Sequence, residues 1–387
     1  MHRSLSGCML ALLLSLLVAA ASCPISADAR PWSVVWRLPL PCAPGHFHFV
    51  ETHGPYLSVC VPPEGAWMVN RATGAVAWRA HADYACASVR VSCLGDRALL
   101  FSGMEHEVAL LRVPSGAPVW RRRPPSGFDW AGVWPLRGRG SSEADEAAGG
   151  QPMRFLLLAT EAAMRPGQCR LEVAEADGRM RTVAVLDLAV ARAAYLGGDE
   201  VYLVGGAGGV HATDIATGHD ALRYAVGDTV AYVLEDGPRI CVGGLRGIYA
   251  VDPTRGRLVW QMPRANAMCR DDPVLAEGCL AFADPDGLTL VDTATGKMAR
   301  VTGMNPLTWA RPVVAGRWVY FLAKGNRSES SCLWRVDRQA QSAELLASVE
   351  GKLADHWLPL QADPDAAYIA LADEQGRPQV IKLAPAR

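Results

Sequence analysis

Short stretches in which apolar and polar residues alternate recur along most of the chain. Examples are 210–214 (VHATD), 248–252 (IYAVD) and 288–292 (LTLVD). Alternation with a period of two is typical of β-strands, because successive side chains of a strand point to opposite faces of the sheet. The stretches are separated by turn residues such as Gly, Asp, Asn and Thr. The pattern therefore predicts many short strands joined by tight turns.

One unit of this pattern repeats. In its clearest copy, 248–260 (IYAVDPTRGRLVW), the strand ends at Asp252, a turn glycine follows at Gly256 and an aromatic residue at Trp260. The other copies are full or partial at 68–78, 109–120, 210–218 and 288–296, and weaker at 172–178 and 333–341. An Asp or Asn can accept hydrogen bonds from the backbone of its own turn, and Gly allows the positive φ of a tight reversal. The Trp is expected to pack between neighbouring sheets, where truncation to Ala costs about 3 kcal/mol or more.

The spacing of the units predicts a β-propeller. The turn glycines stand at positions 74, 116, 178, 218, 256 and 296, so units follow one another at 38 to 42 residues except for one gap of 62. That gap contains the polar, Gly-rich stretch 137–151, which is interpreted as a surface loop insertion. A period near 40 residues with four short strands in each unit is the pattern of propeller blades.

The length of the chain favours eight blades over the alternative of seven. Units begin near residues 45, 86, 130, 192, 230, 271 and 310, and 356–383 implies an eighth that ends before an outer strand. The isolated strand 32–38 can supply that strand, with Trp36 as the repeat tryptophan, and so close the ring and remove its edges. Residues 32–387 give 44.5 residues for each of eight blades, against about 51 for each of seven.

The first 29 residues are typical of an export signal. Arg3 precedes the apolar run 10–21, which is too short to span a bilayer, and 27–29 (ADA) is a small-residue cleavage site. A second possibility is lipidation at Cys23, because 20–23 (AASC) is similar to a bacterial lipoprotein box. We therefore expect a signal peptide over 1–29 and one propeller domain over 30–387, with no other segment apolar enough to cross a membrane.

Charge and cysteine content narrow the class further. The 38 basic and 39 acidic residues leave a net charge of −1, which argues against a nucleic-acid-binding protein.

Export permits disulfides. Cys86 with Cys93, and Cys269 with Cys279, are close enough in sequence to staple local hairpins, while the alternative is that several cysteines are small buried strand residues.

The repeat resembles that of the pyrroloquinoline-quinone-type propellers, whose pattern is A-x-D-x-x-T-G-x-x-x-W. Residues 248–260 match best, and 68–78 match with Asn70 in the Asp position. The resemblance implies the propeller fold over nearly the whole mature chain. Two branches of this family are relevant. One is the quinoprotein dehydrogenases, which hold a quinone and calcium. The other is the exported, non-enzymatic propellers, such as the lipoprotein that supports outer-membrane assembly, to which this chain is similar in length, signal and blade count.

We can assign no catalytic, cofactor-binding or metal-binding residue from the sequence. The function predicted is that of a non-catalytic exported scaffold for protein–protein interaction in the cell envelope. The alternatives are a quinone- and calcium-dependent dehydrogenase and a propeller that binds a small molecule or glycan. We expect a periplasmic or outer-membrane-anchored monomer that binds envelope proteins but not nucleic acid, and attaches to a membrane only through a lipidated Cys23.

Six residues are candidates for the surface that contacts a partner. They are Trp130, Trp134, Trp309 and Trp357, which lie at the entrances to blades, together with Arg246 and Arg264. The alternative for these residues is ordinary packing between blades.

Overall fold

The computed structural model describes residues 31–386 except for 42–47, 62–64, 81–88, 95–96, 103–106, 114, 137–152, 162–166, 264–272, 285–286, 308–309, 326–329, 354–359 and 374. Every helix or strand assigned within this part of the chain is a β-strand. No helix there is long and apolar enough to cross a membrane. The predicted signal segment 1–29, Cys23 and the predicted insertion 137–151 lie outside the described residues.

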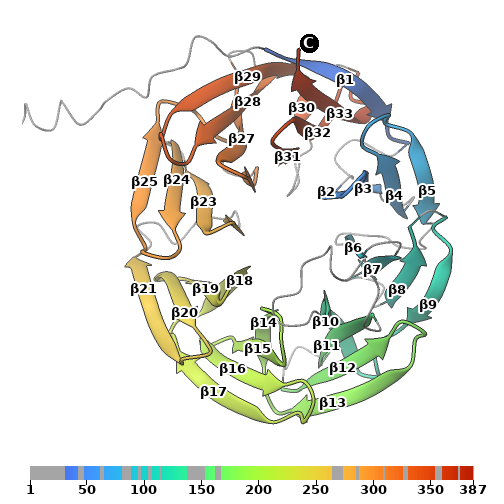
Figure 1. The fold of residues 1–387 in the computed structure, drawn as a ribbon, viewed down its shortest axis with the longest axis vertical. Helices are drawn as coiled ribbons and strands as arrows, with labels where there is room; N and C mark the ends of the chain where they lie inside the picture. Colours follow the sequence, from blue (N-terminus) through green and yellow to red (C-terminus); the bar gives the residue numbers. More distant parts are fainter. Residues whose placement is uncertain are drawn as a thin grey trace, which may run out of the picture.

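The described strands form eight sheets that stand around a central axis as the blades of a propeller (Figure 1). Blades 1 to 4 consist of β2 (His48–His53), β3 (Tyr56–Val61), β4 (Gly65–Asn70) and β5 (Val76–Ala80); β6 (Val89–Leu94), β7 (Arg97–Ser102), β8 (Glu107–Arg112) and β9 (Pro118–Arg122); β10 (Phe128–Pro135), β11 (Arg154–Glu161), β12 (Cys169–Glu175) and β13 (Met180–Leu186); and β14 (Val190–Ala194), β15 (Glu200–Gly205), β16 (Gly209–Asp214) and β17 (Asp220–Ala225). Blades 5 to 7 consist of β18 (Val230–Asp236), β19 (Arg239–Gly244), β20 (Gly247–Asp252) and β21 (Arg257–Pro263); β22 (Val274–Ala276), β23 (Cys279–Asp284), β24 (Gly287–Asp292) and β25 (Met298–Thr302); and β26 (Val313–Ala315), β27 (Trp318–Lys324), β28 (Ser330–Asp337) and β29 (Ala343–Glu350).

Blade 8 closes the ring with strands from both ends of the described chain. It consists of β30 (Lys352–Leu353), β31 (Leu360–Asp363), β32 (Ala366–Ala372), β33 (Pro378–Pro385) and, outermost, β1 (Trp32–Pro39). β1 pairs antiparallel with β33, from Trp32 opposite Pro385 to Pro39 opposite Gln379. The eight-bladed prediction and the closure by the N-terminal strand are therefore confirmed.

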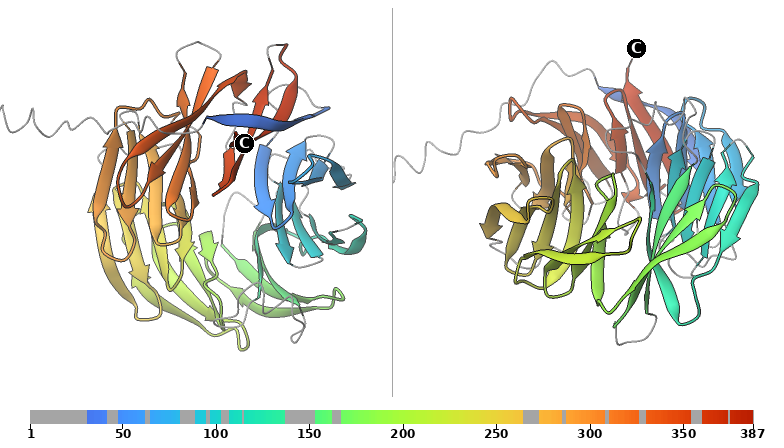
Figure 2. Two further views of the ribbon diagram at one scale, coloured as in Figure 1. Left: turned by 45° about the horizontal axis from the view of Figure 1, so that its top comes forward. Right: turned by 60° about the horizontal axis from the view of Figure 1, so that its bottom comes forward.

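The order of the strands gives the ring two different faces. Within a blade the strands are consecutive and antiparallel, so the second turn of each blade and the connection to the next blade lie on one side, here called the connection face. The first and third turns lie on the other side, here called the hairpin face. Figure 2 shows the ring tilted, with strands running between these two sides.

The third turns have the geometry predicted from the repeat. In blade 4, Asp214 Oδ1 accepts hydrogen bonds from the amides of Ala216 (3.0 Å) and Thr217 (2.6 Å), and Gly218 has a φ of +75°. Asn70 accepts the same pair of bonds in blade 1. Such bonds satisfy turn amides that no strand pairs, and the glycine reverses the chain without a Cβ clash.

Four repeat tryptophans each link their blade to the next. Trp36, Trp78, Trp120 and Trp260 lie on outer strands, and each covers the third-turn glycine of the following blade. An added Cβ on Gly74 would lie 2.8 Å from the Trp36 ring. The Trp36 indole also donates to the carbonyl of Arg71 (3.2 Å), which confirms the repeat-tryptophan role predicted for Trp36.

The hydrophobic core lies between blades rather than in one central body. Leu99 and Leu110 of blade 2, for example, share one cluster with Phe155 and Leu157 of blade 3. Both faces of a blade can pack on neighbouring blades because alternate residues of every strand point to opposite faces of the sheet. The centre of the ring therefore needs no core of its own.

Four of the described cysteines belong to this core. Cys60, Cys169, Cys241 and Cys279 are buried strand residues, as one of the two alternatives predicted. Cys279 has a free thiol, so the structure does not support a disulfide with Cys269. Burial raises the pKa of the Cys169 thiol to about 12, which keeps it protonated and unreactive. Cys86 and Cys269 lie outside the described residues.

Candidate functional site

The second turn of blade 5 holds an apolar and a basic side chain out from the connection face. Leu245 is 52% exposed, and the side chain of Arg246 is 72% exposed. They belong to the turn between β19 and β20, next to the connection that leads from blade 4 into blade 5. Arg246 was one of the six residues predicted to face a partner, whereas Leu245 was not.

A buried aspartate fixes the backbone of this turn. Asp228, 6% exposed, lies in the connection and accepts hydrogen bonds at Oδ2 from the Arg246 amide (2.8 Å) and the Tyr249 hydroxyl (3.1 Å). The Leu245 amide donates to the carbonyl of Thr229 (3.2 Å). The turn and the connection are thus joined by backbone and side-chain bonds, which hold Leu245 and Arg246 in one arrangement.

The electrostatics of this anchor favour the charged carboxylate. Burial by itself raises the pKa of Asp228, but hydrogen bonds from Arg246, Tyr249 and Thr229, together with the Arg246 charge, lower it below the ordinary aspartate value. Arg246 Nε lies 3.5 Å from Asp228 Oδ1, and its guanidinium also donates to the carbonyl of Gly227. Asp228 therefore remains an acceptor at neutral pH.

Glycines make room for the anchor. A Cβ on Gly244 would lie 2.3 Å from Asp228 Oδ2, and a Cβ on Gly243 would lie 2.0 Å from the ring of Tyr232. Any side chain at these positions would displace the carboxylate or the ring. The run 243–247 (GGLRG) is therefore the sequence signal of this site, although its glycines alone could not identify the aspartate 16 residues earlier.

The two described tryptophan candidates lie in the inter-blade core. Trp130 is 3% exposed and packs with Trp120 and Phe155 between blades 2 and 3. Trp134 is half-buried against the cluster between blades 3 and 4. These positions match the alternative of packing between blades, and they leave little of Trp130 for a partner.

Three other candidates, Arg264, Trp309 and Trp357, lie outside the described residues, as does the candidate lipidation site Cys23. The three described candidates, Trp130, Trp134 and Arg246, do not share one surface, because the two tryptophans lie in different inter-blade clusters of blade 3 and Arg246 lies in blade 5. What the structure adds is the pairing of Leu245 with Arg246 and their support by Thr229 and Asp228, through hydrogen bonds between residues 16 and 18 positions apart.

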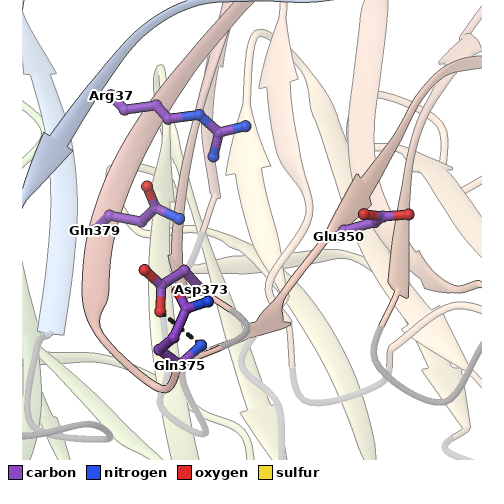
Figure 3. Close-up of a pocket in the computed structure, with 5 residues that line it drawn as sticks. All are labelled: Arg37, Glu350, Asp373, Gln375 and Gln379. Atoms are coloured by element: carbon purple, nitrogen blue, oxygen red, sulfur yellow. Dashed lines mark hydrogen bonds between the residues drawn. The ribbon is translucent and has the colours of Figure 1, made fainter.

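A small polar pocket opens near the ring closure, also on the connection face. It has a volume of about 170 Å³ and is lined by Arg37, Glu350, Asp373, Gln375 and Gln379 (Figure 3). Gln379 is buried, whereas Asp373 is bonded to Arg377, whose amide and side chain donate to its carboxylate at 2.9 and 2.8 Å. The pocket has room for a few water molecules, well below the usual size of a ligand site.

The described residues present no recognisable centre for a metal or quinone. Among them, no three His, Cys, Asp or Glu side chains gather closely enough to hold an ion. They therefore give no ligand set that we can assign to calcium with a quinone, and we derive no chemistry from that group.

Comparison with solved structures shows a widespread fold. BamB from Moraxella catarrhalis is 14% identical, with a TM-score of 0.57 over 91% of this chain and 97% of that chain. Sqt1 from Saccharomyces cerevisiae is 8% identical, with a TM-score of 0.61 over 94% and 100%. A europium-containing methanol dehydrogenase is 10% identical, with a TM-score of 0.58 over 91% and 93%. At these identities the likeness concerns the fold alone. Among curated protein sequences, none matches.

The sequence itself matches a family. Residues 172–379, more than half of the chain, match the family described as outer membrane protein assembly factor BamB. This stretch begins in blade 3 and ends in blade 8, so it includes the turn with Leu245 and Arg246. The repeat, the eight blades and this match agree, and the chain belongs to the BamB family of pyrroloquinoline-quinone-type propellers.

Proposed function

We propose that this protein is a non-catalytic scaffold that binds a protein partner in the cell envelope through its connection face. The observation that carries the proposal is the turn of blade 5, where Leu245 and Arg246 are exposed on a backbone held by Asp228. Membership of a family described by outer-membrane assembly supports the envelope as the place of action.

The chemistry of the turn suits a partner with an apolar hollow beside a carboxylate. Leucine contributes by burial of its apolar surface, and arginine by forked hydrogen bonds to a carboxylate. Because the backbone is already fixed, less conformational entropy is lost when the partner binds. The Arg246 guanidinium can keep its contacts with Asp228 and Gly227 while its remaining N–H groups contact the partner.

Export is part of the same proposal. The segment 1–29 would direct the chain across the membrane, with cleavage after Ala29 or, alternatively, lipidation at Cys23. The mass of the mature N-terminus distinguishes a diacylglyceryl cysteine from a chain that begins at Arg30.

Site-specific photo-cross-linking tests the partner-binding role. A benzophenone amino acid replaces Leu245, or, as a control on the hairpin face, the exposed Ala340 in the third turn of blade 7. In cells of the source organism, position 245 is expected to cross-link one envelope protein reproducibly, and position 340 is not. The same cross-link should disappear when Arg246→Glu is added.

Two outcomes would contradict the proposal. One is the absence of any reproducible cross-linked envelope protein at position 245. The other is an equal yield at position 340, or one that Arg246→Glu leaves unchanged, because neither result requires the anchored turn.

A further inference from the structure

The outer strand of every blade is an exposed sheet edge, and seven of the eight described edges are interrupted. In each of the seven, one residue of the outer strand lies outside the pairing register and forms a β-bulge. The bulged residues are Val35, Ala77, Val119, Val183, Arg223, Val259 and Leu346. Bulges twist an edge away from regular pairing and so protect it against the addition of another strand.

The exception is β25 of blade 6. Its five residues pair with β24 without a shift, from Met298 opposite Val291 to Thr302 opposite Gly287. In Figure 1, β25 lies at the perimeter of the ring, and no described strand covers its outer side. Among the described outer strands, only β25 offers a regular edge along its full length.

The direction of the backbone groups on β25 follows from the turn that precedes it. The Asp292 amide donates to the carbonyl of Lys297 (2.9 Å), so Lys297 faces β24. In an antiparallel ladder the residues alternate, and the backbone N–H and C=O groups of Met298, Arg300 and Thr302 therefore point toward the outer edge.

The side chains of β25 combine apolar surface with positive charge. Met298 is 62% exposed, the highest value among the exposed large hydrophobic residues of the described chain. Lys297 and Arg300 are also exposed, and the run 297–302 (KMARVT) contains no acidic residue. Val301, on the other side of the strand, is 2% exposed and anchors β25 to the core between blades 6 and 7.

We propose that β25 is a docking edge for an extended, acidic segment of a partner protein, which would add to blade 6 as a fifth strand. Main-chain hydrogen bonds to the outward groups of β25 would supply affinity, and contacts with Met298 and Arg300 would select apolar and acidic side chains. The acidic preference follows from Arg300 on this strand and Lys297 directly before it. The site is on the perimeter, separate from the connection face, so it does not depend on the turn of blade 5.

A defined peptide tests the edge on the full-length mature protein. The probe is an end-capped decapeptide of alternating valine and glutamate, and its controls are the valine–lysine peptide and a copy with alternate backbone amides methylated. The valine–glutamate peptide is expected to slow hydrogen exchange of the Met298, Arg300 and Thr302 amides. The two control peptides should leave these amides unprotected.

Proline substitutions separate edge pairing from general binding. Arg300→Pro removes an outward N–H and leaves the bonds to β24 in place, because proline is tolerated where an edge N–H faces solvent. Leu222→Pro is the matched control, since Leu222 occupies the same place after its turn glycine on the bulged strand β17 and is 58% exposed. Arg300→Pro should weaken peptide binding by about tenfold, through loss of one main-chain hydrogen bond and of the Arg300 charge, and Leu222→Pro by less than about twofold.

Charge reversal keeps the test decisive if Arg300→Pro unfolds blade 6. Arg300→Glu is expected to abolish binding of the valine–glutamate peptide and to allow binding of the valine–lysine peptide instead. Failure of the glutamate peptide to bind, equal protection of β17 and β25, or equal binding of both peptides by the unmodified protein would overturn the proposal. None of these results bears on the cross-link at position 245.

Discussion

At the scale of single residues, a turn glycine in this ring is also a packing surface. Gly74, Gly116, Gly178 and Gly296 each lie against the tryptophan of the preceding blade, where an added Cβ would come within 2.8 to 3.1 Å of it. Gly278 has nearly the same φ as Gly296, +74° against +71°, but only the Thr293 hydroxyl oxygen lies within 4 Å of an added Cβ. Comparing alanine variants of Gly296 and Gly278 therefore separates backbone strain from disturbed packing of the tryptophan.

Gly296→Ala is expected to destabilise the protein more than Gly278→Ala. Both variants place an alanine in the left-handed region, at a cost of about 1–2 kcal/mol. Gly296→Ala also pushes a methyl group to 2.8 Å from the Trp260 ring, which overpacks the contact by roughly 1–3 kcal/mol more. Urea unfolding followed by tryptophan fluorescence measures the difference, and equal midpoints would show that the indole moves aside freely.

The sequence predicted the tryptophan role but not its variations. The Trp260 indole donates to the carbonyl of Thr293 (2.8 Å), whereas the buried indole nitrogens of Trp78 and Trp120 have no partner among the described residues. The indoles that donate are those of Trp36 and Trp260, and they cover the turns that start with Asn70 and Asp292. Trp78 and Trp120 cover the turns that start with Arg112 and Glu175. The hydrogen bonds within each turn set the position of the carbonyl that the indole could reach, and the spacing of the repeat does not reveal that position.

At the scale of elements, the blade boundaries were predictable because each strand carries its own alternation and each turn its own glycine. The inner part of blade 8 was not. There, β30 and β31 both pair with β32 at different places, and no period in the sequence marks that division. The predicted disulfide between Cys269 and Cys279 lacks support for a related reason, since sequence proximity does not say whether a thiol such as that of Cys279 points into the core.

One side chain of a turn makes several polar contacts across the boundary between blades 8 and 1. Arg71, in the third turn of blade 1, donates to the Tyr368 hydroxyl (3.0 Å) and to the carbonyl of Gly54, and it forms an ion pair with Asp363. Lys382 donates to the carbonyl of Arg71 (2.9 Å). Burial, followed by the charge of Arg71, lowers the pKa of Lys382. Arg71 thus adds polar contacts to the apolar packing that joins these two blades.

Arg71→Ala is expected to loosen the closure. It removes contacts between half-buried groups and leaves Asp363 without its cation, at a cost of about 2 kcal/mol, between the values for exposed and buried pairs. Arg79→Ala is the control, because Arg79 stacks on Trp67 of its own blade at 4.2 Å and should cost only about 0.5–1 kcal/mol. Hydrogen exchange should accelerate in β1 and β33 for Arg71→Ala alone. Equal acceleration in both variants would contradict a special role of Arg71.

At the scale of the whole molecule, length and repeat spacing were enough to predict a ring of eight. They were not enough to locate its site. Tyr249 and Arg246 meet Asp228 only after the turn of blade 5 has folded against the connection, and the buried position of Trp130 is set by the neighbouring blade. Similarly, the regular edge of β25 becomes visible only when its register is compared with seven others.

The same closure has a further consequence for how the chain can be cut and joined. The Ala386 amide donates to the carbonyl of Pro31 (3.2 Å), so the two ends of the described chain touch beside β1 and β33. A short linker there would turn this pairing into an ordinary third hairpin of a blade. New ends could then be opened at the exposed pair Ser126 and Gly127, between blades 2 and 3.

Such a circular permutant should fold to the same eight blades, with unchanged near-ultraviolet circular dichroism. A linear chain that lacks residues 31–39 should lose the outer strand of blade 8 and unfold at lower urea, because β33 becomes an unprotected edge. If the permutant fails to fold, covalent order matters to assembly. If it folds, the blades have no true first or last member, and evolution or design can place the ends of the chain at any connection of the ring.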